Sequence, residues 1–136
     1  MGCDIHAYLE KKNSDGTYSY VKDVFESREY NLFAFLAGVR NYIRIKPIND
    51  ARGLPTDLSE YVKDEYENWK YDAHSVSWID VDELYDFNYM NNVHDENTSF
   101  SYQFMTYTTF LGEHTLSDIL KLGQYINHRI VFWFDN

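Results

Sequence analysis

The 136-residue sequence contains one cysteine, two prolines and only 12 basic residues. A single cysteine excludes an internal disulfide framework and fits a reducing compartment. No apolar run approaches the roughly 18 residues of a membrane span, and no signal-peptide core is present. These absences predict a soluble cytoplasmic protein that has no membrane partner. By length, residues 1–136 are predicted to form a single domain.

Positive charge is scarce relative to negative charge: 22 acidic residues give a formal net charge of −10. Such a chain is repelled by a phosphate backbone, which argues against polymeric nucleic acid as a partner. Aromatic residues, in contrast, are abundant, with 13 Tyr, 9 Phe and 3 Trp. These rings either fill the core or line a groove that stacks planar ligands or packs on a partner.

The first ten residues alternate strictly between apolar and polar side chains, which is typical of a strand. Cys3 falls on the apolar face, so we expect a buried, inert thiol rather than a nucleophile. Asp4 and His6 fall on the other face, roughly 7 Å apart at about 3.3 Å of rise per residue. This separation allows the two side chains to share a ligand or an ion.

The remaining elements are predicted from turn, capping and periodicity signals. Asn13-Ser14-Asp15-Gly16 predicts the turn of a hairpin over residues 3–25, and the spacing of apolar residues predicts a short helix within residues 28–41. The further expected elements are a helix capped by Asp57 with Glu60, a short strand over 72–79, a brief helix capped by Asp80 with Glu83, a strand over 100–110, a helix starting at Thr115 and a central strand over 129–136.

Together these elements predict an α+β fold, with an antiparallel or mixed sheet of about five strands and three or four helices mainly on one face. Because both ends of the chain read as strands, we expect them to pair in one sheet. That pairing would bring Trp133 or Asp135 close to Asp4 and His6. We further expect the face that carries Asp4 and His6 to open on the principal pocket.

Two clusters carry most of the candidate chemistry: Asp4 with His6, and His74 with Ser75, Ser77 and Trp78. In the extended segment after Asp72, His74 and Trp78 are predicted to point one way and the two serines the other way. No metal-binding signature, phosphate loop or nucleophile elbow is present. Asp4, His6 and His74 are nevertheless candidate metal ligands or acid–base groups, provided that the fold brings them together.

Arginines lie in the segment around the first predicted helix and in the loop that follows it. Guanidinium groups bind phosphate in a bidentate manner, and aromatic rings stack on bases, so the two together suit a nucleotide-type ligand. Alternatively, each arginine pairs with one of the 22 acidic residues. The candidate ligand-binding residues are Asp4, His6, Arg28, Arg40, Arg52, His74, Ser75, Ser77 and Trp78.

Several segments are similar to those of an uncharacterised family of small proteins encoded by bacteriophages and prophages. The similarity covers the opening Met1-Gly2-Cys3-Asp4-Ile5-His6, residues 28–41, residues 52–55, residues 74–78 and residues 131–136. The family has no established activity, so the resemblance says nothing about the chemistry of this protein. It implies only that the protein is expressed in the cytoplasm of an infected bacterium. Small phage accessory proteins often act against host defence.

Three hypotheses follow. The first is a non-catalytic phage counter-defence protein that sequesters a small nucleotide-type signalling ligand and needs no cofactor. The second is a phosphodiesterase or related hydrolase that uses a divalent metal bound by Asp4, His6 and His74. The third is an acidic inhibitor of a host nucleic-acid-binding protein. A host protein partner and a homo-oligomer both remain open.

Overall fold

A four-stranded antiparallel sheet forms the centre of the protein. The structure, a computed structural model, describes residues 2–94 and 105–136. The strands are β1 (Asp4–Lys12), β2 (Tyr18–Val24), β3 (His74–Asp80) and β4 (His128–Asp135), in the order β2-β1-β4-β3. The α+β class, the hairpin and the short strand before Asp80 are confirmed. Among residues 2–94 and 105–136 the sheet has four strands rather than about five.

The strand predicted over residues 100–110 is wrong where the structure describes it, and residues 100–104 lie outside the described part. Helix α4 (Tyr107–Lys121) begins there, capped by the Thr106 hydroxyl, which accepts a hydrogen bond from the Thr109 N–H at 3.3 Å. The Thr and aromatic content is typical of strands, but the cap determines the local structure. Helix α4 is interrupted at Gly112, whose φ of 83° and ψ of 166° are not helical, so a second helical segment follows it and contains the buried Thr115, close to the predicted start of the last helix.

The described part of the chain contains three other α-helices. Helix α1 (Tyr30–Ala37) ends at Gly38, whose φ of 70° suits glycine. Helix α3 (Val81–Asp86) has the predicted capping box formed by Asp80 and Glu83. Helix α2 (Glu60–Trp69) begins after Ser59, whose hydroxyl caps the Val62 N–H, so the prediction of Asp57 as its cap is wrong. A 3₁₀ turn, η1 (Leu122–Tyr125), precedes β4.

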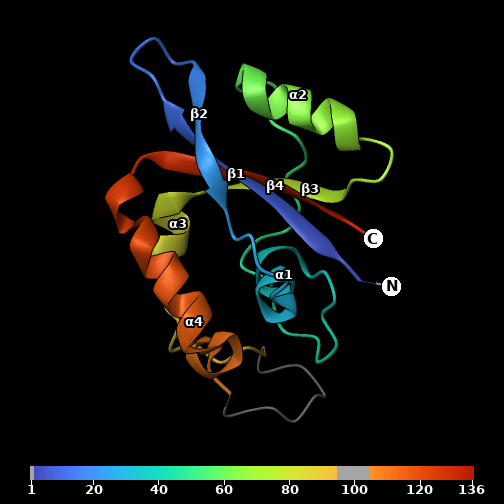
Figure 1. Ribbon diagram of the computed structural model, residues 1–136. Helices are drawn as coiled ribbons and strands as arrows, with labels where there is room; N and C mark the ends of the chain where they lie inside the picture. Colours follow the sequence, from blue (N-terminus) through green and yellow to red (C-terminus); the bar gives the residue numbers. More distant parts are fainter. Residues whose placement is uncertain (1, 95–104) are drawn as a thin grey trace.

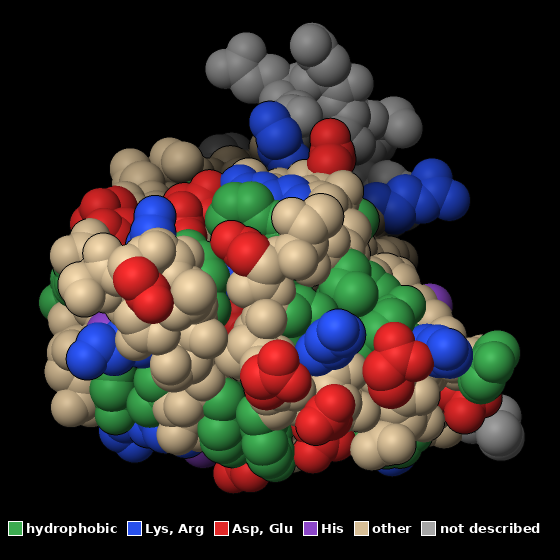
Figure 2. All heavy atoms as spheres, turned by 90° about the horizontal axis from the view of Figure 1, so that it is seen from above, with side chains coloured by type: hydrophobic (Ala, Val, Ile, Leu, Met, Phe, Trp, Pro, Cys, Tyr) green, Lys and Arg blue, Asp and Glu red, His purple; other side chains and the backbone are tan. Residues whose placement is uncertain are grey.

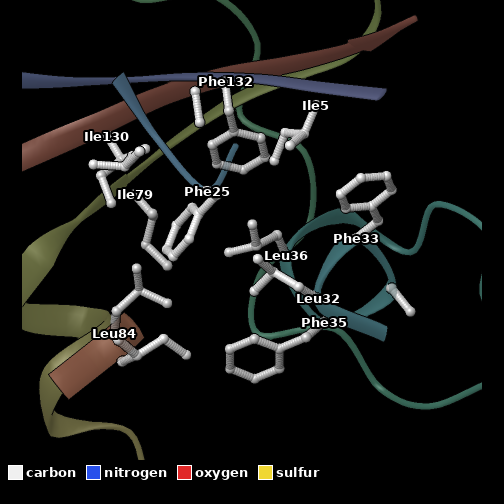
Figure 3. Close-up of a cluster of buried hydrophobic side chains, with 14 of the residues drawn as sticks. Ile5, Phe25, Leu32, Phe33, Phe35, Leu36, Ile79, Leu84, Ile130 and Phe132 are labelled. Atoms are coloured by element: carbon white, nitrogen blue, oxygen red, sulfur yellow. The ribbon is translucent and has the colours of Figure 1, made fainter. Parts of the chain in front are cut away.

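The helices cover both faces of the sheet. Helices α1, α3 and α4 lie below it and α2 lies above it in Figure 1. The main core fills the space between the sheet and the lower helices, where Phe132 and Ile5 from the strands meet Phe33 and Leu36 from α1 (Figure 3). A smaller core lies under α2 and contains Trp133. The helices are thus mainly, though not wholly, on one face.

The first and last strands pair, as predicted. β1 is antiparallel to β4, with Asp4 opposite Asp135 and His6 opposite Trp133. Cys3 is fully buried on the main-core side, and burial raises the pKa of its thiol, which agrees with an inert cysteine. No helix in the described ranges is long and apolar enough to cross a membrane.

Candidate functional site

The polar face of β1 is mostly covered, contrary to the expected open pocket. Tyr8 is 4% exposed because it packs against Tyr61 and Val62 of α2, and Glu10 is 0% exposed beside Ser59 of the preceding loop. Asp4 and His6, near the start of the strand, remain partly accessible. Asp4 and His6 line none of four surface cavities with volumes of about 270 to 560 Å³.

His6 pairs with Asp135 at this end of the sheet. His6 Nε2 lies 2.5 Å from Asp135 Oδ2, and the side chains are 19% and 20% exposed. The Trp69 ring from the end of α2 packs on the imidazole with ring centroids 4.2 Å apart. Because a carboxylate only accepts hydrogen bonds, Nε2 carries the proton when His6 is neutral.

Asp4 is held by Arg28 rather than by His6. Arg28 Nε and Nη2 donate to the two carboxylate oxygens of Asp4 at 2.9 and 3.1 Å. These hydrogen bonds lower the pKa of Asp4. The guanidinium also packs closely on Gly2, where a Cβ would collide with it. The Cys3 N–H donates to the Tyr30 hydroxyl at 3.1 Å, so the opening residues have structural roles.

A β-bulge on β3 changes the predicted directions of its side chains. The pairing with β4 shifts between His74 and Ser77, and Ser75 has a φ of 54°. His74 therefore lies on the main-core face with Ser77, next to the Phe134 ring, whereas Val76 and Trp78 lie under α2. The prediction that His74 and Trp78 share one face is wrong, because the extra residue of the bulge reverses the alternation.

Arg52 is committed to contacts within the protein. Its guanidinium forms a bidentate ion pair with Glu83 at 2.6 and 2.8 Å and lies 4.5 Å from the centre of the Trp78 ring. The Arg52 N–H donates to the hydroxyl of buried Ser77. The hydrogen bonds from Arg52 lower the pKa of Glu83. For Arg28 and Arg52, pairing with an acid is thus what the structure shows.

Arg40 lies elsewhere, beside Tyr30 and Tyr42. Its guanidinium is 5.1 Å from the centre of the Tyr30 ring and donates to the Tyr42 hydroxyl at 3.3 Å. The nine candidate residues thus occupy separate places: the start of β1, the end of α1 and the length of β3. Their binding of a ligand stays a prediction.

The candidate metal ligands do not assemble. His6 lies on the α2 face of the sheet and His74 on the opposite face. Within residues 2–94 and 105–136, no group of three or more His, Cys, Asp or Glu side chains is arranged to hold a metal ion. The geometry therefore offers no support to the metal-dependent hydrolase.

The largest of the four cavities contains one predicted residue, Trp78. This hollow has a volume of about 560 Å³, lies at the end of the sheet remote from Asp4, and is lined by Lys12, Asn13, Ser14, Tyr18, Trp78, Asp80 and Asn127. Arg129 Cζ lies 3.5 Å from the centre of the Tyr18 ring, and Arg52 Cζ lies 4.5 Å from the centre of the Trp78 ring. Burial raises the pKa of Asp80.

No motif in the sequence marked Tyr18, Lys12 or Asn127 as site residues. The hairpin predicted over residues 3–25 is confirmed, and within it Lys12 pairs with Tyr18. Asn127, with a φ of 71°, precedes β4, and only the sheet order brings it near the hairpin.

Acidic side chains do not form one continuous patch on the α2 side of the molecule (Figure 2). Figure 2 shows acidic and basic side chains interspersed with hydrophobic ones on this face. A protein that mimics nucleic acid needs a continuous acidic surface, so this face does not favour the inhibitor hypothesis.

Comparison of the chain with protein-family models, with curated proteins and with solved structures found no match.

Proposed function

We propose that the protein binds and sequesters a small nucleotide-type ligand without cleaving it, in the setting of phage counter-defence that its sequence implies. The observation that carries the binding proposal is the hollow between Tyr18 and Trp78. Its volume of about 560 Å³ falls within the range of ligand pockets, roughly 300–1,000 Å³.

Two aromatic rings in the lining supply stacking surfaces for a base. Each ring has a guanidinium packed against it, Arg129 on Tyr18 and Arg52 on Trp78. Arg129 is only 4% exposed and Arg52 is fixed by Glu83, so both rings are supported from within the protein. Rings that are already oriented lose little conformational entropy when a ligand binds.

The polar groups of the hollow suit the rest of a nucleotide. Lys12 offers an ammonium to a phosphate, and the side-chain amide of Asn127 can hydrogen-bond to the edge of a base. The amide nitrogen of Asn13 already donates to Thr17 and Ser19 within the hairpin, which leaves its oxygen as an acceptor. The Asp80 carboxylate repels phosphate and accepts hydrogen bonds from sugar hydroxyls or an exocyclic amine. The hollow therefore favours a ligand whose phosphate lies towards Lys12.

A melting-temperature screen of mononucleotides, dinucleotides and cyclic dinucleotides tests the proposal, because a ligand that binds only the folded state raises the melting temperature. Trp78→Ala and Tyr18→Ala should each weaken binding about five- to 150-fold, since base stacking contributes about 1–3 kcal/mol. Tyr71→Ala is the matched control, because Tyr71 is 90% exposed and lies outside the hollow. Absence of binding across the panel would refute the proposal.

The same samples separate the alternatives. Ligand released by heating should be chemically intact, whereas a cleaved product would show that the protein hydrolyses the nucleotide rather than sequestering it. A melting shift with Mg²⁺, Mn²⁺ or Zn²⁺ that His6→Ala and His74→Ala both abolish would restore the metal-dependent hydrolase. Co-purification with a host nucleic-acid-binding protein, together with no nucleotide binding, would favour the inhibitor.

A further inference from the structure

The bulge in β3 holds a non-glycine residue in a conformation that glycine usually adopts. Ser75 has a φ of 54°, in the left-handed region, and β3 is an edge strand of the sheet. A side chain at positive φ costs free energy, and such residues occur preferentially at functional sites. Bulges on edge strands likewise reorient single side chains beside active sites.

Ser75 begins a chain of three side chains. His74 Nδ1 lies 3.0 Å from Ser75 Oγ, and His74 Nε2 lies 2.5 Å from Asn136 Oδ1. The Phe134 ring stacks beside the imidazole, with centroids 6.1 Å apart and an interplanar angle of 29°. Ser75 and His74 are both partly exposed, so the pair lies at the surface of the sheet edge.

The hydrogen bonds define the tautomer of His74. With the amide oxygen of Asn136 facing the ring, a neutral His74 carries its proton on Nε2, because an amide oxygen only accepts. Nδ1 then has a free lone pair and accepts from the hydroxyl of Ser75. A hydroxyl that donates to an imidazole, with the imidazole oriented by a third group, is the arrangement of an activated nucleophile.

We propose that Ser75 is a nucleophile, His74 its general base and Asn136 a positioning residue, in a metal-free site that hydrolyses small carboxylic esters. This activity is independent of ligand capture in the hollow beside Trp78. Ser75 Oγ attacks the ester carbonyl carbon and its proton passes to His74 Nδ1. The bond from that carbon to the alkoxy oxygen breaks, and His74 returns the proton to the departing alcohol.

Water completes the reaction. His74 Nδ1 takes a proton from water as its oxygen attacks the acyl group on Ser75. The acyl–Oγ bond breaks, the proton goes to Ser75 Oγ, and the carboxylic acid leaves. The reaction consumes one ester and one water and releases one alcohol and one acid, so no further reactant is required.

The strand supplies a matched control in Ser77. This serine is 3% exposed, and its hydroxyl accepts a hydrogen bond from the Arg52 N–H at 3.0 Å, so it is neither accessible nor near a base. Ser75→Gly removes the nucleophile while accommodating the positive φ, so this variant should melt at or above the temperature of the natural protein.

The test is labelling of the intact protein with a fluorophosphonate, which a serine attacks at phosphorus with loss of fluoride. We expect one adduct per chain, located on Ser75 by peptide mass spectrometry, and hydrolysis of p-nitrophenyl acetate. Ser75→Gly should lose both signals, and Ser77→Ala should keep both. His74→Ala should slow labelling at least a hundredfold.

Asn136 is tested by rescue. Asn136→Ala should slow labelling about tenfold, and Asn136→Asp should restore it, because a carboxylate also accepts from Nε2 and stabilises the imidazolium. A purely structural role would not produce this rescue. The proposal is overturned if the folded natural protein gives no adduct on Ser75, or if labelling is equally fast in His74→Ala.

Discussion

Arg129 and Glu10 form an ion pair inside the protein, with Nε 2.7 Å from Oε1 and side chains only 5% and 0% exposed. The pair connects β4 to β1 beneath the loop that leads into α2. Glu10 Oε2 also accepts from the Ser59 N–H at 2.8 Å, and Arg129 reaches Asp57 at 2.9 Å. One buried carboxylate thus joins the sheet to the start of α2.

Glu10→Ala should destabilise the protein by about 3–5 kcal/mol, because it leaves the buried guanidinium and the Ser59 N–H without this partner. Urea unfolding measures the loss. Glu67→Ala is the control. Both side chains of the Glu67–Lys70 pair are at least 40% exposed, so its loss should change the free energy of unfolding little. Equal effects of the two substitutions would contradict the burial of the Glu10 pair.

The Arg52–Glu83 pair should make stability depend on pH in the acid range. Hydrogen bonds from Arg52 lower the pKa of Glu83 below its ordinary value of 4.5. A lowered pKa stabilises the folded state above the ordinary value, and this stabilisation is lost as the pH falls through the lowered pKa. Between about pH 6 and pH 3, Glu83→Gln should therefore lose less stability than the natural protein does.

Arg52→Gln is the reciprocal test in the same urea titration. It should flatten the acid-side dependence as Glu83→Gln does, and the double variant should add little, because one pair accounts for both effects. Additive changes would show that the two residues act separately.

Gly38→Ala should destabilise the protein by about 1–2 kcal/mol, since φ at this position is 70° and an L side chain is strained there. The Gly38 N–H closes α1 by donating to the Ala34 carbonyl at 2.8 Å. Gly38→Asn should cost less, because asparagine adopts this conformation more readily. Thermal unfolding of the three proteins measures the difference, and equal stability would contradict the cap.

Trp133 should report on the packing of α2. Its ring is fully buried in the smaller core, and its indole N–H has no hydrogen-bond partner within the described residues. With Trp69→Phe and Trp78→Phe in place, the remaining tryptophan should emit at short wavelength and resist quenching by acrylamide.

Adding Val62→Ala, which removes a fully buried side chain of α2, should increase the quenching of Trp133. A matched substitution on the exposed side of α2, Lys63→Ala, should leave it unchanged. Strong quenching before either substitution would show that α2 does not cover this face.

Features that depend on neighbouring residues were predicted from the sequence. The alternation in β1, the turn that contains Gly16 and the capping box between Asp80 and Glu83 each involve residues close in the chain. The strand predicted over residues 100–110 was wrong, where it is described, because of another local feature. Composition favoured a strand, but the Thr106 hydroxyl caps a helix that begins at Tyr107.

The face on which His74 lies required the tertiary structure. A bulge shifts every later side chain to the other face, and its position depends on how β3 aligns with β4. The sequence could therefore place His74 in a strand, but not on a side of the sheet. The contact of His74 with Asn136 spans 62 residues and has no local signal.

The amino-acid sequence by itself determined the α+β class, the strands at its two ends and the burial of Cys3, because periodicity and apolar character specify these features locally. Only the tertiary structure decided which acid each arginine meets: Asp4 for Arg28, Glu83 for Arg52 and Glu10 for Arg129, across 24, 31 and 119 residues. With 22 acidic side chains available, the attraction between opposite charges does not select a partner. The packing of the sheet against α2 and α3 brings particular charges within hydrogen-bonding distance. The same packing places the guanidinium groups of Arg129 and Arg52 against Tyr18 and Trp78, the two rings that line the hollow.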